Sequence, residues 1–467
     1  MKALVVAPHP FFTPRGTPFS VYYRTLVTAE LGVEVDLLTY WEGQEVAIPG
    51  VRVIRIPWVP FTAKVPVGPS LKKLVLDLMM FLWTVGLLVR RRYDFVHAHE
   101  ESVFFCSWLK PIFGFKLVYD MHSSLPQQLS NFEFTKSQLP IRVFERLERT
   151  ALHSATAIVT ICPDLAEQVE SQLADTSHHF LIENSIFEDV KLAPASPSST
   201  DETEIMQSVP LAPLVVYSGT FEAYQGLDVL IEAFAEVHRH RPDASLLLVG
   251  GTPVQVARYR ALADSHGLNG GCRFTGRVSQ ATARCLSQRA TVLTSPRIKG
   301  TNTPLKIYEQ LASGIPLVAT RIHSHTQVLD DDVCFLVEPT AAGLASGILQ
   351  AITDPDKRET VTRGALELYD RRYARPVYEQ KMRNMLELLR VRLAADRRAE
   401  GRLDALVDGI NGYAFTLVVL ALLTPVVMIR PVLMLLTRVT NSTATTVRIR
   451  LARRRLAPRV ASTVAVD

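Results

Sequence analysis

Short apolar runs alternate with amphipathic segments along most of the chain. The run ALVVA at residues 3–7 is strand-like, and residues 19–31 carry apolar side chains at helical spacing. Alternation of this kind is typical of an α/β domain built on a parallel sheet. The strands predicted in the first part of the chain are residues 3–7, 33–40, 51–56, 95–100, 116–123, 157–161 and 179–184.

A second series of the same elements follows a polar linker. Residues 191–213 are rich in Pro, Ser, Ala and acidic residues, a composition with little tendency to fold. We therefore predict two Rossmann-like α/β domains, at 1–190 and 214–375, that face each other across a ligand-binding cleft, followed by a helical segment at 376–408. The strands predicted in the second domain are residues 214–219, 245–251, 272–276, 291–296, 317–320 and 332–339.

The segment TSPRIKGTNTPLKIYEQLASGIPLVAT, residues 294–320, carries the most informative pattern. Thr303 is predicted to cap a helix whose first residue is Pro304, where a missing N–H has no cost. Gly314 and Pro316 are expected to end this helix, and the apolar residues that follow predict a buried strand.

Several charged and polar side chains collect on this segment. Lys306 and Glu309 fall on the polar face of the predicted helix, while Arg297, Lys299 and Asn302 precede it in the turn. A helix N-terminus with cations nearby is an anion site, most simply for phosphate. The alternative is an ordinary amphipathic helix whose charged face is solvated. The remaining members of the two faces are Gln310 and Ser313 on the polar side, and Leu305, Ile307, Tyr308, Leu311 and Ala312 on the apolar side.

Composition and charge limit the classes of protein to which the chain can belong. At 467 residues the chain is longer than a single core usually allows. The net charge of +5, spread over this length, gives no indication of nucleic-acid binding. The five cysteines are scattered and form no CxxC. This pattern favours a reducing compartment and gives no support for a zinc site or a disulfide framework. The apolar run after Met1 is shorter than that of a signal peptide, so we expect a buried strand there.

Residues 409–467 differ in composition from the rest of the chain. Residues 410–429 contain no charged side chain and are long enough to cross a bilayer. Eight arginines follow, with no acidic residue before Asp467, and such a cluster belongs near anionic lipid on the cytoplasmic face. Pro425 and Pro431 favour a re-entrant or interfacial hairpin over a single span. We predict a membrane-associated tail at 409–467, with a C-terminal helix packed on the protein itself as the alternative.

A second apolar stretch lies at 74–89, between the basic pair Lys72/Lys73 and the basic run Arg90–Arg92. Asp77 interrupts it, and a predicted strand follows soon after. We therefore prefer a core helix of the first domain, while an amphipathic helix lying in a membrane surface is the alternative.

Six sequence pieces, in order and at the right spacing, resemble the family-4 retaining glycosyltransferases of the GT-B fold. The resemblance covers roughly residues 1–390. The pieces are Gly16-Thr17 after the first strand, YDFVHAHE, KLVYDMHSS with His122, LIENS with Asn184, YSGTFEAYQGLDVLIEAF, and TPLKIYEQLASGIPLVAT. The resemblance implies that the second domain binds a nucleotide sugar, that the first carries most of the acceptor site, and that transfer retains the anomeric configuration without a metal ion.

The resemblance also assigns roles to particular residues. Glu309 matches the second Glu of the family's Glu-x7-Glu motif and would accept hydrogen bonds from the ribose hydroxyls, as a carboxylate can. His122 matches the active-site histidine that contacts the transferred sugar; a histidine satisfied by the backbone at a strand end is the alternative. His97 and His99 alternate on one strand face and are expected to be mainly structural. The residues expected to bind the donor are Gly16, Thr17, Gly219, Thr220, Arg297, Lys299, Asn302, Thr303, Lys306 and Glu309.

Two departures from the family pattern concern charge. The first Glu of Glu-x7-Glu is Thr301 here, and the Arg and Lys that commonly follow the second domain's first strand are Thr220 and Gln225. Arg297, Lys299 and Lys306 are the available substitutes for a diphosphate clamp, because cations there would offset the charge that grows as the sugar–phosphate bond breaks.

The sequence thus predicts a glycosyltransferase at the cytoplasmic membrane face. We expect a UDP- or GDP-linked sugar as the donor, a lipid-linked or polysaccharide acceptor, the membrane surface as a further partner, and no cofactor. The alternatives are another GT-B enzyme, such as a phosphorylase or an epimerase, and a non-catalytic nucleotide-sugar-binding protein. A dehydrogenase is disfavoured because no clear GxGxxG follows a strand.

Overall fold

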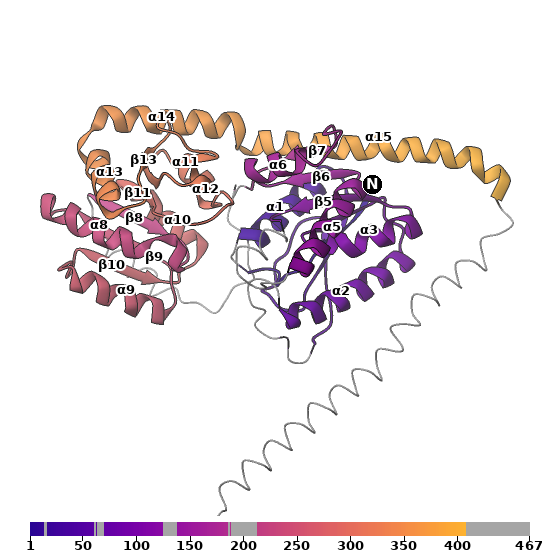
Figure 1. Cartoon of the computed structure of the whole chain (residues 1–467), viewed down its shortest axis with the longest axis horizontal. Helices are drawn as coiled ribbons and strands as arrows, with labels where there is room; N and C mark the ends of the chain where they lie inside the picture. The colour runs from indigo at the N-terminus through magenta and orange to yellow at the C-terminus, as the bar shows by residue number, and fades with distance from the viewer. Residues whose placement is uncertain are drawn as a thin grey trace, which may run out of the picture. The chain divides into compact units, whose positions relative to one another are not determined.

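Two parallel sheets, each covered by helices, form the computed structural model of the chain (Figure 1). Both belong to one compact unit, Met1–Leu393, and a second unit comprises Ala394–Asp467. The predicted tail at 409–467 lies outside the residues that the structure describes. Those residues are 1–13, 16–59, 62, 70–124, 138–184, 187 and 213–407.

The first sheet has seven strands in the order β3-β2-β1-β4-β5-β6-β7, all parallel. Nearly every residue of β1, β4 and β5 is buried, as expected for central strands with helices on both faces. The strands are β1 (Lys2–Ala7), β2 (Glu34–Thr39), β3 (Val51–Arg55), β4 (Phe95–His99), β5 (Lys116–Met121), β6 (Ala157–Thr160) and β7 (His179–Leu181). The helices of this part are α1 (Gly16–Glu30), α2 (Leu71–Arg90), α3 (Ser102–Phe113), α5 (Gln138–Ser154) and α6 (Pro163–Glu170).

The second sheet has six parallel strands in the order β10-β9-β8-β11-β12-β13. The prediction of two α/β domains with parallel sheets is therefore confirmed. The strands are β8 (Leu214–Ser218), β9 (Ser245–Val249), β10 (Cys272–Gly276), β11 (Val292–Ser295), β12 (Leu317–Thr320) and β13 (Phe335–Val337). The helices are η1 (Ala223–Gln225), α8 (Leu227–His240), α9 (Pro253–Ser265), α10 (Gln280–Gln288), α11 (Lys306–Leu311), α12 (His323–Thr326), α13 (Ala341–Thr353), α14 (Pro355–Arg372) and α15 (Arg375–Val407).

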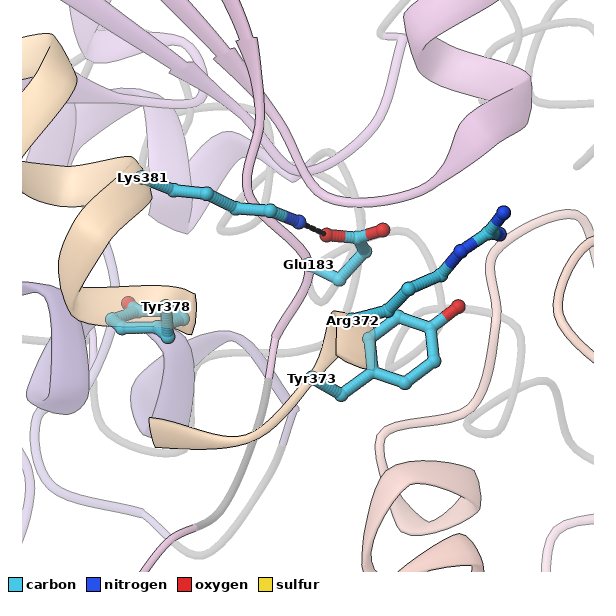
Figure 2. Close-up of a pocket in the computed structure, with 5 residues that line it drawn as sticks. All are labelled: Glu183, Arg372, Tyr373, Tyr378 and Lys381. Carbon is cyan, nitrogen blue, oxygen red and sulfur yellow. Dashed lines mark hydrogen bonds and ion pairs between the residues drawn. The ribbon is translucent and has the colours of Figure 1, made fainter. Parts of the chain in front are cut away.

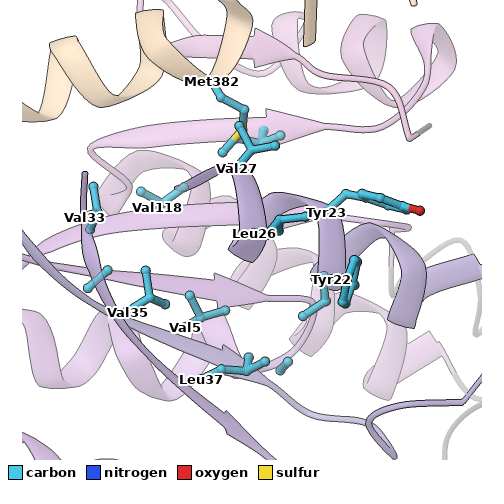
Figure 3. Packing of buried hydrophobic residues seen from close by; sticks show 14 of the residues in the cluster. Val5, Tyr22, Tyr23, Leu26, Val27, Val33, Val35, Leu37, Val118 and Met382 are labelled. Atoms are coloured by element: carbon cyan, nitrogen blue, oxygen red, sulfur yellow. The ribbon is translucent and has the colours of Figure 1, made fainter. Parts of the chain in front are cut away.

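The core of the first sheet includes side chains from the far end of the sequence. Tyr22, Leu26 and Val27 of α1 pack on the sheet, and Met382 of α15 joins the same cluster (Figure 3). Tyr378, Met385, Leu386 and Leu389 of α15 are buried in it as well. Helix α15 follows the second domain in the sequence and yet contributes side chains to the core of the first domain.

A small hollow lies where α15 meets the first domain (Figure 2). Lys381 Nζ donates to Glu183 Oε2 at 2.5 Å across it. Tyr373, Tyr378 and Arg372 also line it. This space is far smaller than a usual ligand pocket, and Lys381 pairs with Glu183 across it, so we assign it to the attachment of α15 rather than to a substrate.

Helix α2 has one buried and one exposed apolar face. Leu76 and Met80 lie in the core of the first domain, which confirms the preferred prediction of a core helix for that face. On the outer face, Leu74 is 65% exposed and Val75 is 44% exposed. Among the helices of the described ranges, none combines the length and apolar composition of a transmembrane span.

Candidate functional site

The loops after β8 and β11 meet at one edge of the second sheet, because these neighbouring strands are parallel and their carboxyl ends coincide. Ile298 in the loop after β11 donates its backbone N–H to Tyr224 O in η1, at 3.0 Å. The predicted donor-binding residues of the second domain lie on these two loops and on α11. This edge of the sheet is therefore the candidate site.

Helix α11 is shorter than predicted and has no side-chain cap. It begins at Lys306, after Leu305, and Thr303 makes no capping bond, so the prediction of Thr303 as N-cap and Pro304 as first helical residue is wrong. The N–H of Ile307 instead bonds to Pro304 O at 3.0 Å, a tight turn that takes the place of a capped start. Leu305 packs against both the first-domain and second-domain cores, and this packing holds the turn.

The polar and apolar faces predicted for this helix are only partly correct. Ile307, Tyr308 and Leu311 are buried as expected. Gln310, predicted on the solvated face, is buried, and Ala312, predicted on the apolar face, is exposed. Because the helix ends at Leu311, the periodicity does not extend to position 312.

The ammonium group of Lys306, a side chain of intermediate exposure, is itself shielded from solvent and has no carboxylate partner among the described residues. Its Nζ lies 4.1 Å from the centroid of the Tyr217 ring and finds no hydrogen-bond acceptor in the described part of the chain. Burial and the nearby Arg297 lower the pKa of Lys306 to about 7. Lys306 also lies beside Gly219, since a Cβ on that glycine would be 3.8 Å from Nζ. A cation in this state is poised to accept an anion from outside the protein.

Arg297 organises the loop after β11. Its Nε donates to Lys299 O at 2.8 Å and its Nη1 donates to Asn302 O at 2.9 Å, while the guanidinium stacks over Tyr224 at 5.1 Å. Gly300, at φ 138°, permits this fold of the loop, because a Cβ there would lie only 2.3 Å from Arg297 Nη2. Burial lowers the pKa of Arg297. The side chain thus both shapes the loop and places a second positive charge near Lys306.

The other predicted positions on these loops differ in exposure. The side chains of Lys299 and Thr301 are exposed, and so is Thr220, which follows β8. Oε1 of Gln225 is buried without a hydrogen-bond partner among the described residues. Thr301 stands where the family has a carboxylate, and Thr220 and Gln225 stand where it has the clamp cations. These three positions therefore contribute no charge, and the positive charge comes from Arg297 and Lys306.

Glu309 on α11 pairs with a residue that the sequence did not reveal. Arg284 of α10 donates from Nη2 to Glu309 Oε1 at 3.2 Å, and about a third of each side chain is exposed. The two residues are separated by 25 positions along the chain. No local spacing in the sequence could have indicated this pair. The ion pair orients the Glu309 carboxylate, which remains partly exposed to solvent.

Asn302 connects the candidate site to the first sheet. Its Nδ2 donates to the backbone carbonyl of His122, at the end of β5, at 2.7 Å. Two predicted site residues separated by 180 positions are thus brought into contact. Gly16 and Thr17 begin α1, and among the described residues no hydrogen bond or ion pair joins them to this segment. A Cβ on Gly16 would meet open space.

His122 belongs to a buried network of histidines and one carboxylate. His99 Nδ1 and His122 Nε2 share a hydrogen bond of 2.9 Å, and His97 Nε2 and Asp120 Oδ2 share another of 2.9 Å. Arg24 of α1 forms an ion pair with Asp120, with Nε 2.6 Å from Oδ2. His99, expected to be mainly structural, therefore bonds directly to the predicted active-site histidine, and His97 connects to it through Asp120 and the His99 ring.

Burial sets the protonation of this network. Burial lowers the pKa of His122 to about 4, and it lowers the pKa of His99 well below its usual value. Burial alone would raise the pKa of Asp120, but Arg24 and the neighbouring histidines hold it below its usual range. At neutral pH the site therefore contains neutral His99 and His122 rings beside an ionised Asp120.

His97, His99 and Asp120 form the one group among the described residues whose ligand atoms lie close enough together to hold a metal ion. Asp120 Oδ2 is already engaged by the Arg24 guanidinium, which a divalent cation would have to displace. The donor set fits an ion-paired hydrogen-bond network better than a metal centre.

Two family models match consecutive parts of the chain. Residues 24–184 match the glycosyl transferase 4-like domain, and residues 212–354 match glycosyl transferases group 1. The first match covers most of the first sheet, including His122. The second covers the loops after β8 and β11 together with α11.

Curated relatives match most of the chain at low identity. A D-inositol 3-phosphate glycosyltransferase from Corynebacterium efficiens is 25% identical over 70% of this chain and 80% of its own length. A phosphatidyl-myo-inositol mannosyltransferase from Mycolicibacterium smegmatis is 24% identical over 77% of this chain and 86% of its own length. An alpha-D-kanosaminyltransferase from Streptomyces kanamyceticus is 23% identical over 63% of this chain and 78% of its own length.

Solved structures share the fold. Sucrose-phosphate synthase from Thermosynechococcus elongatus superposes with a TM-score of 0.63 at 19% identity, covering 84% of this chain and 99% of that protein. HepE from Anabaena in complex with UDP-glucose superposes with a TM-score of 0.60 at 18% identity, covering 83% of this chain and 99% of that protein.

Proposed function

We propose that this chain, which is a glycosyltransferase of the GT-B, family-4 type, transfers a sugar from a UDP- or GDP-linked donor to a lipid-linked or saccharide acceptor. The donor diphosphate binds beside Lys306 and Arg297, and the ribose hydroxyls bind to Glu309. Transfer retains the anomeric configuration and requires no cofactor.

The observation that carries this proposal is the unpaired Lys306 ammonium group. A buried cation with no carboxylate among the described residues costs stability, so its presence calls for an anionic ligand. Gly219, directly after β8, leaves room beside Nζ for such a ligand. UDP and UDP-glucose are the ligands named for HepE, whose fold this chain shares.

The same cations support a metal-independent reaction. A nucleoside diphosphate carries growing negative charge as it leaves the sugar, and fixed positive charges in a site that excludes water stabilise it. Arg297 and Lys306 supply two such charges, in place of the residues that the family usually has at positions 220 and 225. Lys299, exposed on the same loop, is a third candidate cation.

Several observations favour an acceptor at a membrane surface. Two relatives have names that refer to phosphatidylinositol: the mannosyltransferase described above, and a phosphatidylinositol N-acetylglucosaminyltransferase component from Arabidopsis thaliana. The outer face of α2 exposes Leu74, Val75 and Leu78, and Lys72 and Arg90 flank it. Apolar side chains with basic ends suit the interface of an anionic membrane. We place the enzyme on the cytoplasmic face, with the arginine-rich tail as a further contact.

A panel of UDP- and GDP-sugars tests the proposal. A donor at about a hundred times its Kd stabilises a folded protein by about 2.7 kcal/mol, so the correct nucleotide sugar should raise the melting temperature. Turnover with that donor in excess EDTA, followed by determination of the product anomer, then tests metal independence and retention. Stabilisation by none of the nucleotide sugars would contradict the donor assignment.

A non-catalytic nucleotide-sugar-binding protein is the second candidate, favoured by one observation. Thr301 is exposed at the position where the family carries a carboxylate that helps to hold the sugar. Tight binding of UDP or GDP without release of sugar, with or without an acceptor, would favour this candidate. Another GT-B enzyme, a phosphorylase or an epimerase, would be identified by its product.

A further inference from the structure

Helix α6 of the first domain has no side-chain cap of its own. Its N-cap residue, Cys162, forms no capping hydrogen bond, and Pro163 occupies the first helical position. The first N–H of the helix that needs an acceptor is therefore that of Asp164. Gln327 Oε1 accepts from this N–H at 3.0 Å, although 163 positions separate the two residues. A residue of the second domain thus caps a helix of the first.

The side-chain amide of Gln327 is engaged at both of its polar atoms. Its Nε2 donates to the backbone carbonyl of Thr301, in the loop after β11. The two backbone partners fix the orientation of the amide, because an N–H must meet its oxygen and a carbonyl must meet its nitrogen. A carboxylate at this position could only accept, and an ammonium group could only donate. Gln327 therefore joins the start of α6 to the loop that carries Arg297.

Buried contacts fix the two helices that this amide connects. Gln327 directly follows α12. Within that helix, His325 donates from Nδ1 to Thr320 O at 2.8 Å and shares a hydrogen bond of 3.0 Å with Ser295 Oγ, at the ends of β12 and β11. Leu165 of α6 is buried in the core of the first domain. The loop after β11 thus bonds to a side chain whose surroundings are held independently of the loop.

This loop is held at two successive peptide groups. Gln327 donates to Thr301 O, and the next carbonyl is that of Asn302. Arg297 Nη1 donates to Asn302 O at 2.9 Å. Because a peptide group is planar, a bond to its carbonyl also fixes the orientation of the N–H that follows. Loss of the bond to Thr301 would free the peptide group next to the one that Arg297 holds, so the position of the guanidinium depends on Gln327.

We propose that Gln327 is a positioning residue for the donor site: by bonding to both Asp164 and Thr301, it holds the loop after β11 in the shape that places Arg297 beside the donor diphosphate. Its effect on donor binding rests on the proposed function. Its effect on the loop does not, and that effect can be measured without a ligand.

A second contact between the same two helices provides the comparison. His323 Nε2 lies 2.9 Å from Asp164 Oδ1, and the His323 side chain is 62% exposed. Among the described residues this pair makes no hydrogen bond to the loop after β11. If joining α12 to α6 were the whole role of Gln327, loss of the His323 side chain would have a similar effect. His323→Ala is therefore the matched control.

Two substitutions of Gln327 separate its two hydrogen bonds. Gln327→Met removes both. Gln327→Glu keeps an acceptor for the N–H of Asp164, at a helix N-terminus where negative charge is favourable, and removes the donor to Thr301 O. Residue-resolved amide hydrogen exchange of the ligand-free full chain measures the consequence of each loss separately.

Two backbone amides serve as reporters in that experiment. The N–H of Asp164 reports the bond to α6, and the N–H of Ile298, bonded to Tyr224 O at 3.0 Å, reports the shape of the loop. We expect exchange at Ile298 to be roughly tenfold faster in both variants, and exchange at Asp164 to be faster in Gln327→Met alone. Exchange at Ile298 that stays at the wild-type rate in Gln327→Glu would overturn the proposal, because that variant lacks only the bond to the loop.

Turnover measures the consequence for the donor. We expect both Gln327 variants to raise the donor KM about 3- to 10-fold, as for the loss of one hydrogen bond, with a smaller change in kcat. His323→Ala should leave the donor KM unchanged. If His323→Ala raises KM as much as Gln327→Glu does, the positioning role is overturned, since any weakening of the contact between α12 and α6 would then suffice.

The two experiments keep this proposal apart from the proposed function. If the wild-type chain transfers no sugar from any donor, the proposed function fails, and hydrogen exchange still decides whether Gln327 fixes the loop. If turnover is found and both Gln327 variants match the wild type in donor KM, the positioning role is overturned while the function stands. Should Gln327→Met not fold, Gln327→Glu decides in both experiments.

Discussion

Lys306 Nζ lies 4.1 Å from the centre of the Tyr217 ring, and among the described residues no carboxylate approaches it. The aromatic face offers only partial compensation for a desolvated charge, about 2 kcal/mol for a favourable cation–π contact. A lysine in such a position contributes little to folding. The arrangement is understandable if its partner is a diphosphate that arrives with the substrate.

Replacing Lys306 with Met should weaken donor binding and stabilise the ligand-free protein. The pKa of this lysine is lowered to about 7, so the folded chain below that pH carries a charge that the unfolded chain holds more easily. We expect an increase in the free energy of unfolding on the order of a few kcal/mol at pH 6, together with loss of most turnover. Thermal unfolding with and without donor measures both effects.

Lys357→Met is a matched control for that experiment. Lys357 also lies over an aromatic ring, with Nζ 5.3 Å from the centroid of Phe335, but it belongs to α14 and not to the site. Its replacement should change neither turnover nor donor binding. Equal effects of the two substitutions would contradict the assignment of Lys306 to the diphosphate.

Donor affinity should fall as the pH rises through about 7. In the free protein Lys306 loses its proton in that range because burial and Arg297 lower its pKa, whereas a bound diphosphate would retain the proton. We expect affinity to be nearly constant below about pH 6 and to fall by up to roughly tenfold per pH unit above 7. Calorimetry with an intact nucleotide sugar, whose diphosphate does not titrate here, measures this. A Lys306→Met variant with the same pH dependence would contradict the explanation.

Arg297 should not be replaceable by Lys. The guanidinium donates to Lys299 O and Asn302 O from one planar group, and an ammonium group on a lysine cannot reproduce that geometry. We expect Arg297→Lys to lower kcat/KM by about 10-fold or more, because two loop hydrogen bonds at about 1 kcal/mol each are lost and the loop is no longer fixed. Lys299→Ala, which removes an exposed side chain, should have a smaller effect in the same assay.

Separating Arg24 from Asp120 should destabilise the first domain. Both side chains are almost fully buried, and removing one partner of such a pair leaves an uncompensated charge, with a cost of about 3–5 kcal/mol. Asp120→Asn and Arg24→Met should therefore each lower the denaturant midpoint. The double variant should be more stable than the sum of the two losses predicts, and additive losses would show that the pair does not interact.

The outer face of α2 should contribute to vesicle binding. Replacing Leu74, Val75 and Leu78 with Ser removes exposed apolar surface that has little role in the core. We expect sedimentation with anionic vesicles to weaken by about tenfold or more, since burying each such side chain is worth about 1.5–3 kcal/mol. The control replaces Val254 and Leu366, exposed apolar residues of the second domain, with Ser. Unchanged vesicle binding by the α2 variant would contradict this surface.

The order of elements was predictable because it depends on local patterns. Parallel strands buried on both faces leave continuous apolar runs, and the helices between them leave a helical periodicity, so both sheets could be anticipated. The start of α11 could not be predicted in this way, although its sequence fits a capped helix. Leu305 packs against two cores, and that tertiary contact outweighs the local capping preference of Thr303.

Residue types and spacing drew attention to Lys306, Arg297 and Glu309, because the chemistry of anion binding restricts which side chains can serve, and the family resemblance drew attention to His122. Which of these residues meet was decided only by the tertiary structure. Parallel strands bring their carboxyl ends to one edge whatever their separation in sequence, so Asn302 reaches His122, Arg284 reaches Glu309, and His99 joins His122. The absence of a carboxylate beside Lys306 in the described part of the chain is likewise a property of the packed structure, since burial and pairing depend on neighbours that the sequence does not place.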